Sequence, residues 1–170
     1  MASIRKMCCN DLLDMNHILM GQIATTGKDS YGSLLYYDIL CNPDYALVAV
    51  SPGNRILGFI TARIQGEGTE RICDITEIFY RDAGLPEISD MLIQTIVEKA
   101  DKLGKVYFVE ADVPLNNQKF LNLFEKHGFT WDDKQLEGSS KRLRKDLLRN
   151  RLLEAHDNSW FGRSYNNQKR

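Results

Sequence analysis

The chain has 170 residues, of which 43% are hydrophobic and 26% charged, and its formal net charge is −1. These values are typical of one globular domain with a substantial core, and they argue against a surface built throughout for nucleic acid. The four cysteines and three histidines show no metal-binding spacing, so we expect reduced thiols and no metal.

The N-terminal residues do not have the layout of a targeting segment. Asp11 and Asp14 interrupt their apolar run. No stretch of the chain approaches about 18 consecutive apolar residues, so no transmembrane helix is expected. Together with the unpaired cysteines, this leads us to expect a cytoplasmic location.

The N-terminal quarter of the chain predicts one strand and two helices. Ser3–Met7 is a short strand candidate, and Asn10 is a good N-cap for the helix that follows it. Gly21–Ser30 is polar and predicts a loop, and Leu34–Leu40 predicts a second helix.

The clearest local pattern is a hairpin followed by a third strand. Tyr45–Val50 and Arg55–Arg63 are apolar strands, separated by the turn Ser51-Pro52-Gly53-Asn54. In this turn we expect Gly53 to adopt the positive φ. Cys73–Tyr80 alternates between polar and apolar residues and predicts the next strand.

The C-terminal half predicts a strand between two helices, and then a basic segment. Residues 86–102 have helical spacing, Lys105–Val113 is a buried strand, and Asn117–His127 is a helix that Gly128 ends with a left-handed cap. Phe129–Trp131 predicts the start of a last strand. The basic run 141–151 carries leucines at helical spacing, so we interpret it first as an amphipathic helix.

The resulting order is β-α-α-β-β-β-α-β-α-β. Early hairpins and a late strand–helix–strand unit indicate a mixed sheet with helices on both faces, in a single α/β or α+β domain.

Five segments, spread over residues 3–150, share motifs with one known family. They are IRKMCCNDLLDMNHI near the start, DSYG at Asp29–Gly32, PDYALVAVSPGNRILGFITARIQGEG at Pro43–Gly68, YFVEADVPLNNQ at Tyr107–Gln118, and KRLRKDLLRN at 141–150. In these motifs the chain resembles the GNAT acetyltransferase superfamily, and more closely the catalytic subunits of the N-terminal acetyltransferase NatB.

The resemblance implies a fold, a reaction and a partner. Residues 1–153 would form a GNAT-like domain with a mixed, mostly antiparallel sheet, and 154–170 a polar tail. Such enzymes move acetyl from acetyl-CoA to the α-amino group of nascent chains that begin with Met followed by Asp, Glu, Asn or Gln. They work with a large helical-repeat auxiliary subunit that docks on the ribosome.

The resemblance also implies which residues would bind the cofactor and the substrate. The splayed end of the strand Cys73–Tyr80 would contact the pantetheine arm, and a turn at 81–86 would hold the pyrophosphate at a helix N-terminus. The cofactor candidates are Ile78, Phe79, Tyr80, Arg81, Gly84, Leu85 and Asn117, and the substrate candidates are Asp29, Tyr31 and Glu110. Asn117 equally suits a helix N-cap, and Glu110 equally suits a paired buried acid. No general base is identified.

Several residues depart from the family pattern. Pro86 removes one backbone donor from the phosphate turn, and Glu87 and Asp90 place acids beside it. A second, gapless alignment puts 85–90 opposite the motif instead; the first is preferred because it keeps Arg81 and Gly84. Phe124 stands where these enzymes often carry a Tyr near the CoA sulfur.

These departures leave two further hypotheses beside an active enzyme. The chain could keep the fold as a non-catalytic module that occupies the auxiliary subunit. More remotely, the basic run 141–151 could contact nucleic acid. Asp74, on the central strand, also differs from this branch, which carries a His there.

Overall fold

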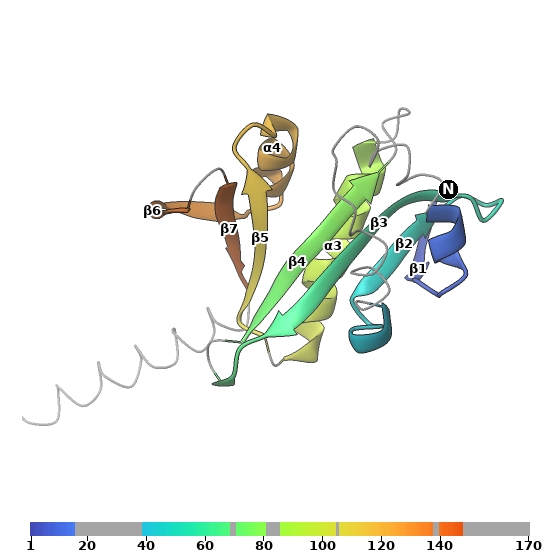
Figure 1. Cartoon of the computed structure of the whole chain (residues 1–170), viewed down its shortest axis with the longest axis horizontal. Helices are drawn as coiled ribbons and strands as arrows, with labels where there is room; N and C mark the ends of the chain where they lie inside the picture. The colour runs from blue at the N-terminus through green and yellow to red at the C-terminus, as the bar shows by residue number, and fades with distance from the viewer. Residues whose placement is uncertain (16–38, 69–70, 81–85, 105, 138–139, 148–170) are drawn as a thin grey trace, which may run out of the picture.

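The computed structural model describes residues 1–15, 39–68, 71–80, 86–104, 106–137 and 140–147. Within them the backbone forms one seven-stranded sheet in the order β1-β2-β3-β4-β5-β7-β6. The strands are β1 (Ser3–Lys6), β2 (Ala46–Val50), β3 (Ile56–Gln65), β4 (Ile72–Tyr80), β5 (Phe108–Pro114), β6 (Thr130–Glu137) and β7 (Ser140–Asp146). Neighbouring strands are antiparallel except for the parallel pair β4 and β5 (Figure 1). The predicted mixed, mostly antiparallel sheet is confirmed.

Helices cover both faces of this sheet. Helix α3 (Pro86–Leu103) and helix α4 (Gln118–Lys126) pack on one face, where their apolar residues join the larger core. On the opposite face, helical residues 11–15 and residue Ile39 cover the end of the sheet formed by β1, β2 and β3. Side chains of strand β2 belong to the cores on both faces, because consecutive side chains of a strand point to opposite faces. No helix among the described residues has the length and apolarity needed to cross a membrane.

Strand β4 contains a bulge at Thr76. On the neighbouring strand β3, Thr61 pairs with Glu77 and Ala62 pairs with Ile75, which leaves Thr76 without a residue opposite it. The hydroxyl oxygens of Thr61 and Thr76 lie 2.8 Å apart and form a hydrogen bond across this irregularity. A bulge adds one residue to one strand and therefore shifts the alternation of its side chains.

The bulge decides which face the end of β4 presents to each core. Ile75 before it and Ile78 after it both contact the core under α3, although an uninterrupted strand would place residues three apart on opposite faces. Phe79 instead stacks on Phe59 on the other face, with ring centroids 5.5 Å apart. The end of β4 is thus anchored on both sides before it reaches residue 80.

The start of α3 and both ends of α4 agree with the expectations from the sequence. Helix α3 begins at Pro86, a position that suits proline because the first helical N–H has no intrahelical partner. The Asn117 side chain caps α4 by accepting a hydrogen bond from the Phe120 N–H, at 3.3 Å. Gly128 follows α4 with φ +79°, the expected left-handed conformation.

The basic segment is a strand over the residues that the structure describes, so its interpretation as a helix was wrong there. Strand β7 spans Ser140–Asp146, pairs with β5, and adds a strand that the sequence had not predicted. Leu143 and Leu147 are both buried, and a spacing of four residues fits one face of a strand as well as one face of a helix. Pairing with β5, which places Leu143 opposite Ala111, decides between the two. Residues 148–151 lie outside the described part.

The turn of the first hairpin also differs from expectation. Asn54, not Gly53, has the positive φ, at +57°. The Asn54 N–H donates to the Ser51 carbonyl and the Ser51 N–H donates to the Arg55 carbonyl, each at 2.9 Å. Asn is one of the few non-glycine residues that tolerate this conformation, so the turn closes without the glycine's freedom.

Candidate active site

The two parallel strands at the centre of the sheet separate after four paired residues. Strand β4 pairs with β5 only from Ile72 to Ile75, opposite Phe108 to Ala111, although β4 continues to Tyr80 and β5 to Pro114. Figure 1 shows the two strands diverging toward the end where α4 begins. A cleft of about 290 Å³ lies between the separated ends.

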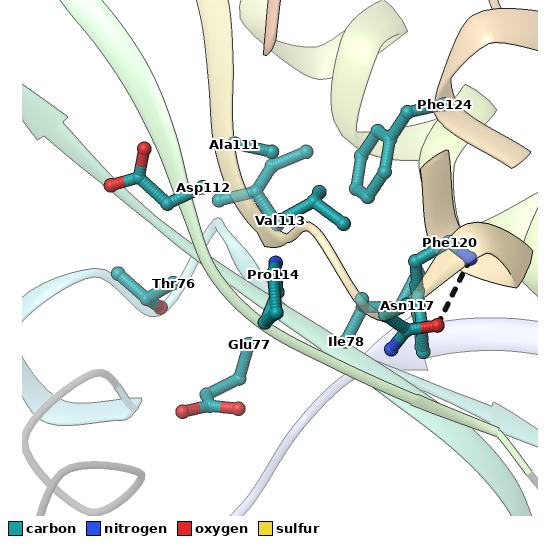
Figure 2. A pocket seen from close by; sticks show the side chains of 11 residues that line it. Thr76, Glu77, Ile78, Ala111, Asp112, Val113, Pro114, Asn117, Phe120 and Phe124 are labelled. Carbon is teal, nitrogen blue, oxygen red and sulfur yellow. Dashed lines mark hydrogen bonds between the residues drawn. The ribbon is translucent and has the colours of Figure 1, made fainter. Parts of the chain in front are cut away.

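The cleft has one apolar and one polar side. Ile78, Val113, Phe120 and Phe124 line it on the side of α4. Thr76, Glu77 and Asp112 line the other side, which belongs to the sheet face opposite α3 (Figure 2). A ligand in this cleft would therefore meet apolar walls from the helical side and carboxylates from the opposite side.

Asn117 offers the cleft a pair of hydrogen-bond donors. Its side-chain oxygen is used by the α4 cap, whereas its amide N–H groups have no partner among the described residues. Because Asn117 also lines the cleft, the cap holds this amide in the cleft wall (Figure 2). The N-cap and ligand-contact interpretations are thus compatible in one side chain.

The other predicted cofactor residues fall in three places. Ile78 lines the cleft. Tyr80 lies beside α4, with its ring edge-on to Phe120 at 5.8 Å and Lys119 Nζ 5.0 Å from the ring centroid. The Phe79 side chain faces the opposite core, so only its backbone remains available to a ligand. Arg81, Gly84 and Leu85 lie outside the described residues.

Phe124 closes the apolar end of the cleft. Only 1% of it is exposed, and it packs edge-on against Phe129 with centroids 5.0 Å apart. A phenyl ring at this position provides shape but no proton donor.

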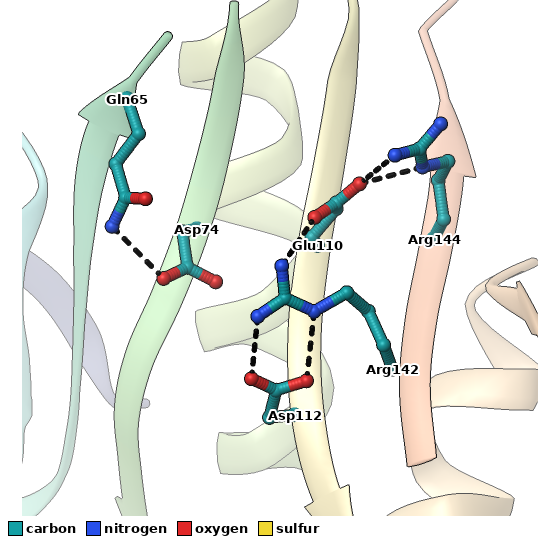
Figure 3. Close-up of polar contacts among 6 residues, drawn as sticks. All are labelled: Gln65, Asp74, Glu110, Asp112, Arg142 and Arg144. Atoms are coloured by element: carbon teal, nitrogen blue, oxygen red, sulfur yellow. Dashed lines mark hydrogen bonds and ion pairs between the residues drawn. The ribbon is translucent and has the colours of Figure 1, made fainter. Parts of the chain in front are cut away.

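Glu110 is a buried carboxylate that holds two strands together. Its side chain is 1% exposed and accepts hydrogen bonds from Arg144 Nε at 2.6 Å and from Arg142 Nη1 at 3.3 Å (Figure 3). Arg142 also forms a bidentate pair with Asp112, at 2.9 and 2.7 Å. These contacts join β5 to β7 and match the paired-acid interpretation of Glu110, and its contact with substrate stays a prediction.

Asp74 on β4 lies in register with Glu110, but no arginine among the described residues is hydrogen-bonded to it. The Gln65 amide donates a hydrogen bond to Asp74, at 3.2 Å (Figure 3). Burial raises the pKa of the Asp74 carboxyl above its usual value; Arg142 opposes this shift, and the nearby Asp112 and Glu110 add to it. The charged form is therefore less well compensated here than at Glu110.

The negative charge of Asp90 is compensated by residues at the C-terminal end of α4. Asp90 should therefore repel a phosphate less than the sequence led us to expect. Its two oxygens contact Lys126 Nζ at 2.7 Å and His127 Nε2 at 2.8 Å. Burial acts to raise the pKa of Asp90, but these hydrogen bonds outweigh it and lower the pKa. Asp90 thus ties α3 to α4 and does not present a free negative charge.

The basic segment is largely engaged within the chain. Arg142 and Arg144 pair with Asp112 and Glu110, and Lys141 Nζ lies 3.4 Å from the Trp131 ring centroid. Arginines that neutralise neighbouring acids provide little net charge for phosphates. The nucleic-acid hypothesis for this segment loses its basis over residues 140–147.

Sequence reasoning did not identify Asp112, Arg142 or Arg144 as members of the site. Alternation was the available signal, since Glu110 and Asp112 share one face of β5 and the two arginines share one face of β7. The pairing of β5 with β7 was needed to bring them together. Asp29 and Tyr31, the predicted substrate contacts, lie outside the described residues.

The cysteines show no sign of catalysis or metal binding. All four are free thiols, and burial raises the pKa of the Cys73 thiol to about 12. Among the described residues, no group of three or more His, Cys, Asp and Glu side chains is arranged to hold a metal ion.

Comparison with known proteins gives relatives by sequence. The chain is 29% identical over 131 residues to the N-terminal acetyltransferase B complex catalytic subunit NAA20 of Arabidopsis thaliana, covering 76% of this chain and 73% of that protein. It is 25% identical over 135 residues to N-alpha-acetyltransferase 20 of Dictyostelium discoideum, covering 76% and 74%. No protein-family model matches the chain.

Solved structures match over most of the chain. The NatB acetyltransferase complex bound to a bisubstrate inhibitor includes a chain with a TM-score of 0.71 at 18% identity, covering 86% of this chain and 91% of that one. Arabidopsis thaliana NAA60 in complex with acetyl-CoA matches with a TM-score of 0.67 at 16% identity, covering 86% and 100%. At these identities the likeness shows the fold alone. The chain therefore has the GNAT acetyltransferase fold and is similar in sequence to NatB catalytic subunits, which confirms the resemblance and the acetyltransferase class expected from its motifs.

Proposed function

We propose that the chain is the catalytic subunit of a NatB-like N-terminal α-amino acetyltransferase. The observation that carries the proposal is the cleft between the separated strands β4 and β5, which is lined from both faces of the sheet. Two substrates can approach such a cleft from opposite sides, a thioester from the side of α4 and an amine from the polar side. The reaction would move acetyl from acetyl-CoA to the α-amino group of a protein.

The residues of the cleft suit a pantetheine arm. Ile78, Val113 and Phe120 would pack against its aliphatic parts, and the free Asn117 amide could donate to one of its carbonyls. Past Ile75, the edge of β4 that faces β5 has no strand partner among the described residues. Its backbone groups can therefore hydrogen-bond a bound ligand, and one N–H would stabilise the oxyanion that forms during transfer. Bound acetyl-CoA would supply the activated acetyl group.

The pyrophosphate would lie on the turn at 81–85. Because α3 begins at Pro86, residues 81–85 directly precede a helix N-terminus in the sequence, and backbone donors and the helix dipole favour anions at such a position. This arrangement supports the alignment that assigns the role to Arg81, Gly84 and Leu85. The second alignment would place the phosphate turn inside the first turns of α3.

The acceptor side makes modest demands on a base. An α-amino group has a pKa of about 7.7–8, so a large minority is already neutral near physiological pH. Holding the amine close to the thioester carbonyl contributes more than proton removal. Phe124 cannot protonate the leaving thiolate, which as a fair leaving group can depart without that help.

We further propose the substrates and partner of a NatB enzyme. Acceptors would begin with Met followed by Asp, Glu, Asn or Gln, and Asp29, Tyr31 and Glu110 are the proposed substrate-side residues. A large helical-repeat auxiliary subunit would complete the complex at the ribosome in the cytoplasm. The similarity in sequence to the Arabidopsis protein named as the N-terminal acetyltransferase B complex catalytic subunit supports this assignment.

The test is acetyl transfer by the assembled complex. The chain is purified with its auxiliary subunit and given labelled acetyl-CoA and peptides beginning Met-Asp, Met-Asn or Ser-Pro. Label on the Met peptides but not on the Ser-Pro control is the expected result. Background incorporation with every peptide would refute the proposal.

A second candidate is a non-catalytic module that competes for the auxiliary subunit. Phe124 in the cleft and Pro86 at the start of α3 favour it, since each removes a group useful for catalysis or binding. Calorimetry of the complex with acetyl-CoA discriminates the two. Micromolar affinity would exclude the non-catalytic candidate, and undetectable binding would support it.

A further inference from the structure

The sheet face that carries the polar side of the cleft also holds three carboxylates in neighbouring positions, Asp74, Glu110 and Asp112. Glu110 and Asp112 are each hydrogen-bonded to arginine, so their charges are compensated locally. Asp74 is not hydrogen-bonded to either of these arginines, and it accepts a hydrogen bond from the neutral Gln65 amide. Arg63 opposes it in the β3 register, and Arg142 acts on it at longer range.

Asp74 lies next to the cleft, although it is not one of the residues that line it. It immediately precedes Ile75, which lines the cleft, and it faces the same side of the sheet as Asp112, which also lines it. Its side chain is half-buried, and burial already disfavours its charged form. A carboxylate in this position contributes little to stability, because no cation in the described part of the chain is bonded to it.

From this placement we infer that Asp74 is a specificity-determining residue that reads the charge of the acceptor peptide, favouring Asn or Gln over Asp or Glu after the N-terminal Met. The inference rests on the proposed function and narrows it. Of the four second residues expected for a NatB-like enzyme, two are neutral amides and two are acids of nearly the same shape. Only charge separates Asn from Asp, and a fixed carboxylate beside the cleft repels one of them.

The expected size of the effect follows from Coulomb's law. Two unit negative charges about 8–10 Å apart in a partly solvated site lower binding by about tenfold. Increasing salt from about 0.05 M to 0.5 M should reduce the discrimination, because it screens partly exposed charges. An acceptor with Asn at the second position escapes this penalty.

The experiment measures binding and transfer separately on the full complex. The chain with its auxiliary subunit is saturated with CoA, and the Kd values of Met-Asn and Met-Asp peptides labelled at the C-terminus are measured by fluorescence anisotropy. We expect the unmodified chain to bind Met-Asn about tenfold more tightly than Met-Asp. In Asp74→Asn the ratio should approach one, through tighter binding of Met-Asp.

A matched control variant removes one negative charge at a position away from the cleft. Glu98 is exposed on α3, on the opposite face of the sheet, so Glu98→Gln should keep the tenfold preference. Equal affinity for both peptides in the unmodified chain, an unchanged ratio in Asp74→Asn, or no binding of either peptide would overturn the inference. Failure of the proposed function is distinct from these results, because it appears as absent acetyl transfer even where the binding preference is found.

Discussion

At the residue scale, Glu110 and Asp74 lie in register on the same sheet face, but their negative charges are compensated to different degrees. Glu110 is more deeply buried than Asp74 yet is held by two arginines, whereas Asp74 is half-buried with an amide partner. Because a buried charge is costly unless it is paired, the first is a structural tie and the second a destabilising charge. An unpaired carboxylate beside a cleft is more useful for binding than for folding.

This difference predicts a pH-dependent effect of Asp74→Asn on stability. The pKa of Asp74 is raised in the folded state, so folding binds a proton between the unfolded pKa, near 3.8, and the higher folded value. Stability is therefore lost as the pH rises through that window. Asp74→Asn should be more stable than the unmodified chain at pH 7, and the gain should shrink toward pH 4. Urea unfolding at both pH values measures it, and an equal gain at both would contradict the assignment.

A second prediction concerns the missing hydroxyl in the cleft. Phe124→Tyr introduces a proton donor at the apolar end, and we expect kcat for acetyl transfer to rise by up to about tenfold with little change in KM. Burying the hydroxyl should cost about 1–3 kcal/mol of stability. Phe129→Tyr is the control, because Phe129 packs against Phe124 but is not among the cleft residues. An equal change in kcat in both variants would argue against a role for the hydroxyl.

At the element scale, the N-terminus of α4 combines folding and binding in Asn117. Asn117→Ala removes the cap and should cost about 1 kcal/mol of stability. Asn117→Asp keeps a capping oxygen but has no N–H to donate, so it should retain stability. Both variants should weaken acetyl-CoA binding measured by calorimetry. Normal affinity in Asn117→Asp would show that the amide only caps the helix.

The close approach of β3, β4 and α3 depends on Gly58, because any larger residue would place a side chain between them. A Cβ on Gly58 would lie 2.7 Å from the Phe79 carbonyl oxygen and 3.1 Å from Ile88 Cγ2. Gly58→Ala should therefore cost about 1–3 kcal/mol, because backbone or helix must shift. Gly53→Ala is the control, since its nearest neighbour is 3.9 Å away and its φ is ordinary. Similar chemical denaturation midpoints for both variants would contradict this account.

At the scale of the whole molecule, the sheet consists of two halves joined by a short parallel pairing. Strands β1 to β4 form one half and β5, β7 and β6 the other, and four residues of β4 connect them directly. The larger core continues under both halves through α3 and α4. A ligand that fills the cleft would bridge the separated strand ends.

Binding at this junction should stabilise the entire fold. At about 100 times its Kd, acetyl-CoA should add about 2.7 kcal/mol, raising Tm by roughly 5–10 °C for a chain of this size. Adenosine 3′,5′-diphosphate, which lacks the pantetheine arm, should give a smaller shift at the same concentration. Differential scanning calorimetry of the complex compares them, and equal shifts would mean that the cleft contributes nothing.

The sequence alone was sufficient for most elements and for the family resemblance. Local periodicity predicted β2, β3, β4, α3 and α4, because their apolar spacing and end signals are encoded within a few residues. Local sequence did not distinguish helix from strand at 140–146, where Leu143 and Leu147 fit either. It also assigned the left-handed turn position to Gly53, although the hydrogen bonds of the turn place Asn54 there.

What only the tertiary structure decided is the site. Ile78 and Asn117 were predicted from motifs, but the cleft that brings them together exists because β4 and β5 separate after Ile75. The pairing of β5 with β7 made two residues of the basic run the partners of Glu110 and Asp112, whereas Asp74 has no arginine bonded to it in the described part of the chain. Such pairings join residues 30 or more positions apart, and they depend on strand order and burial. Neither strand order nor burial follows from the local spacing of residues. The motifs were therefore enough to indicate the family's chemistry, whereas the charge balance of the site required the tertiary structure.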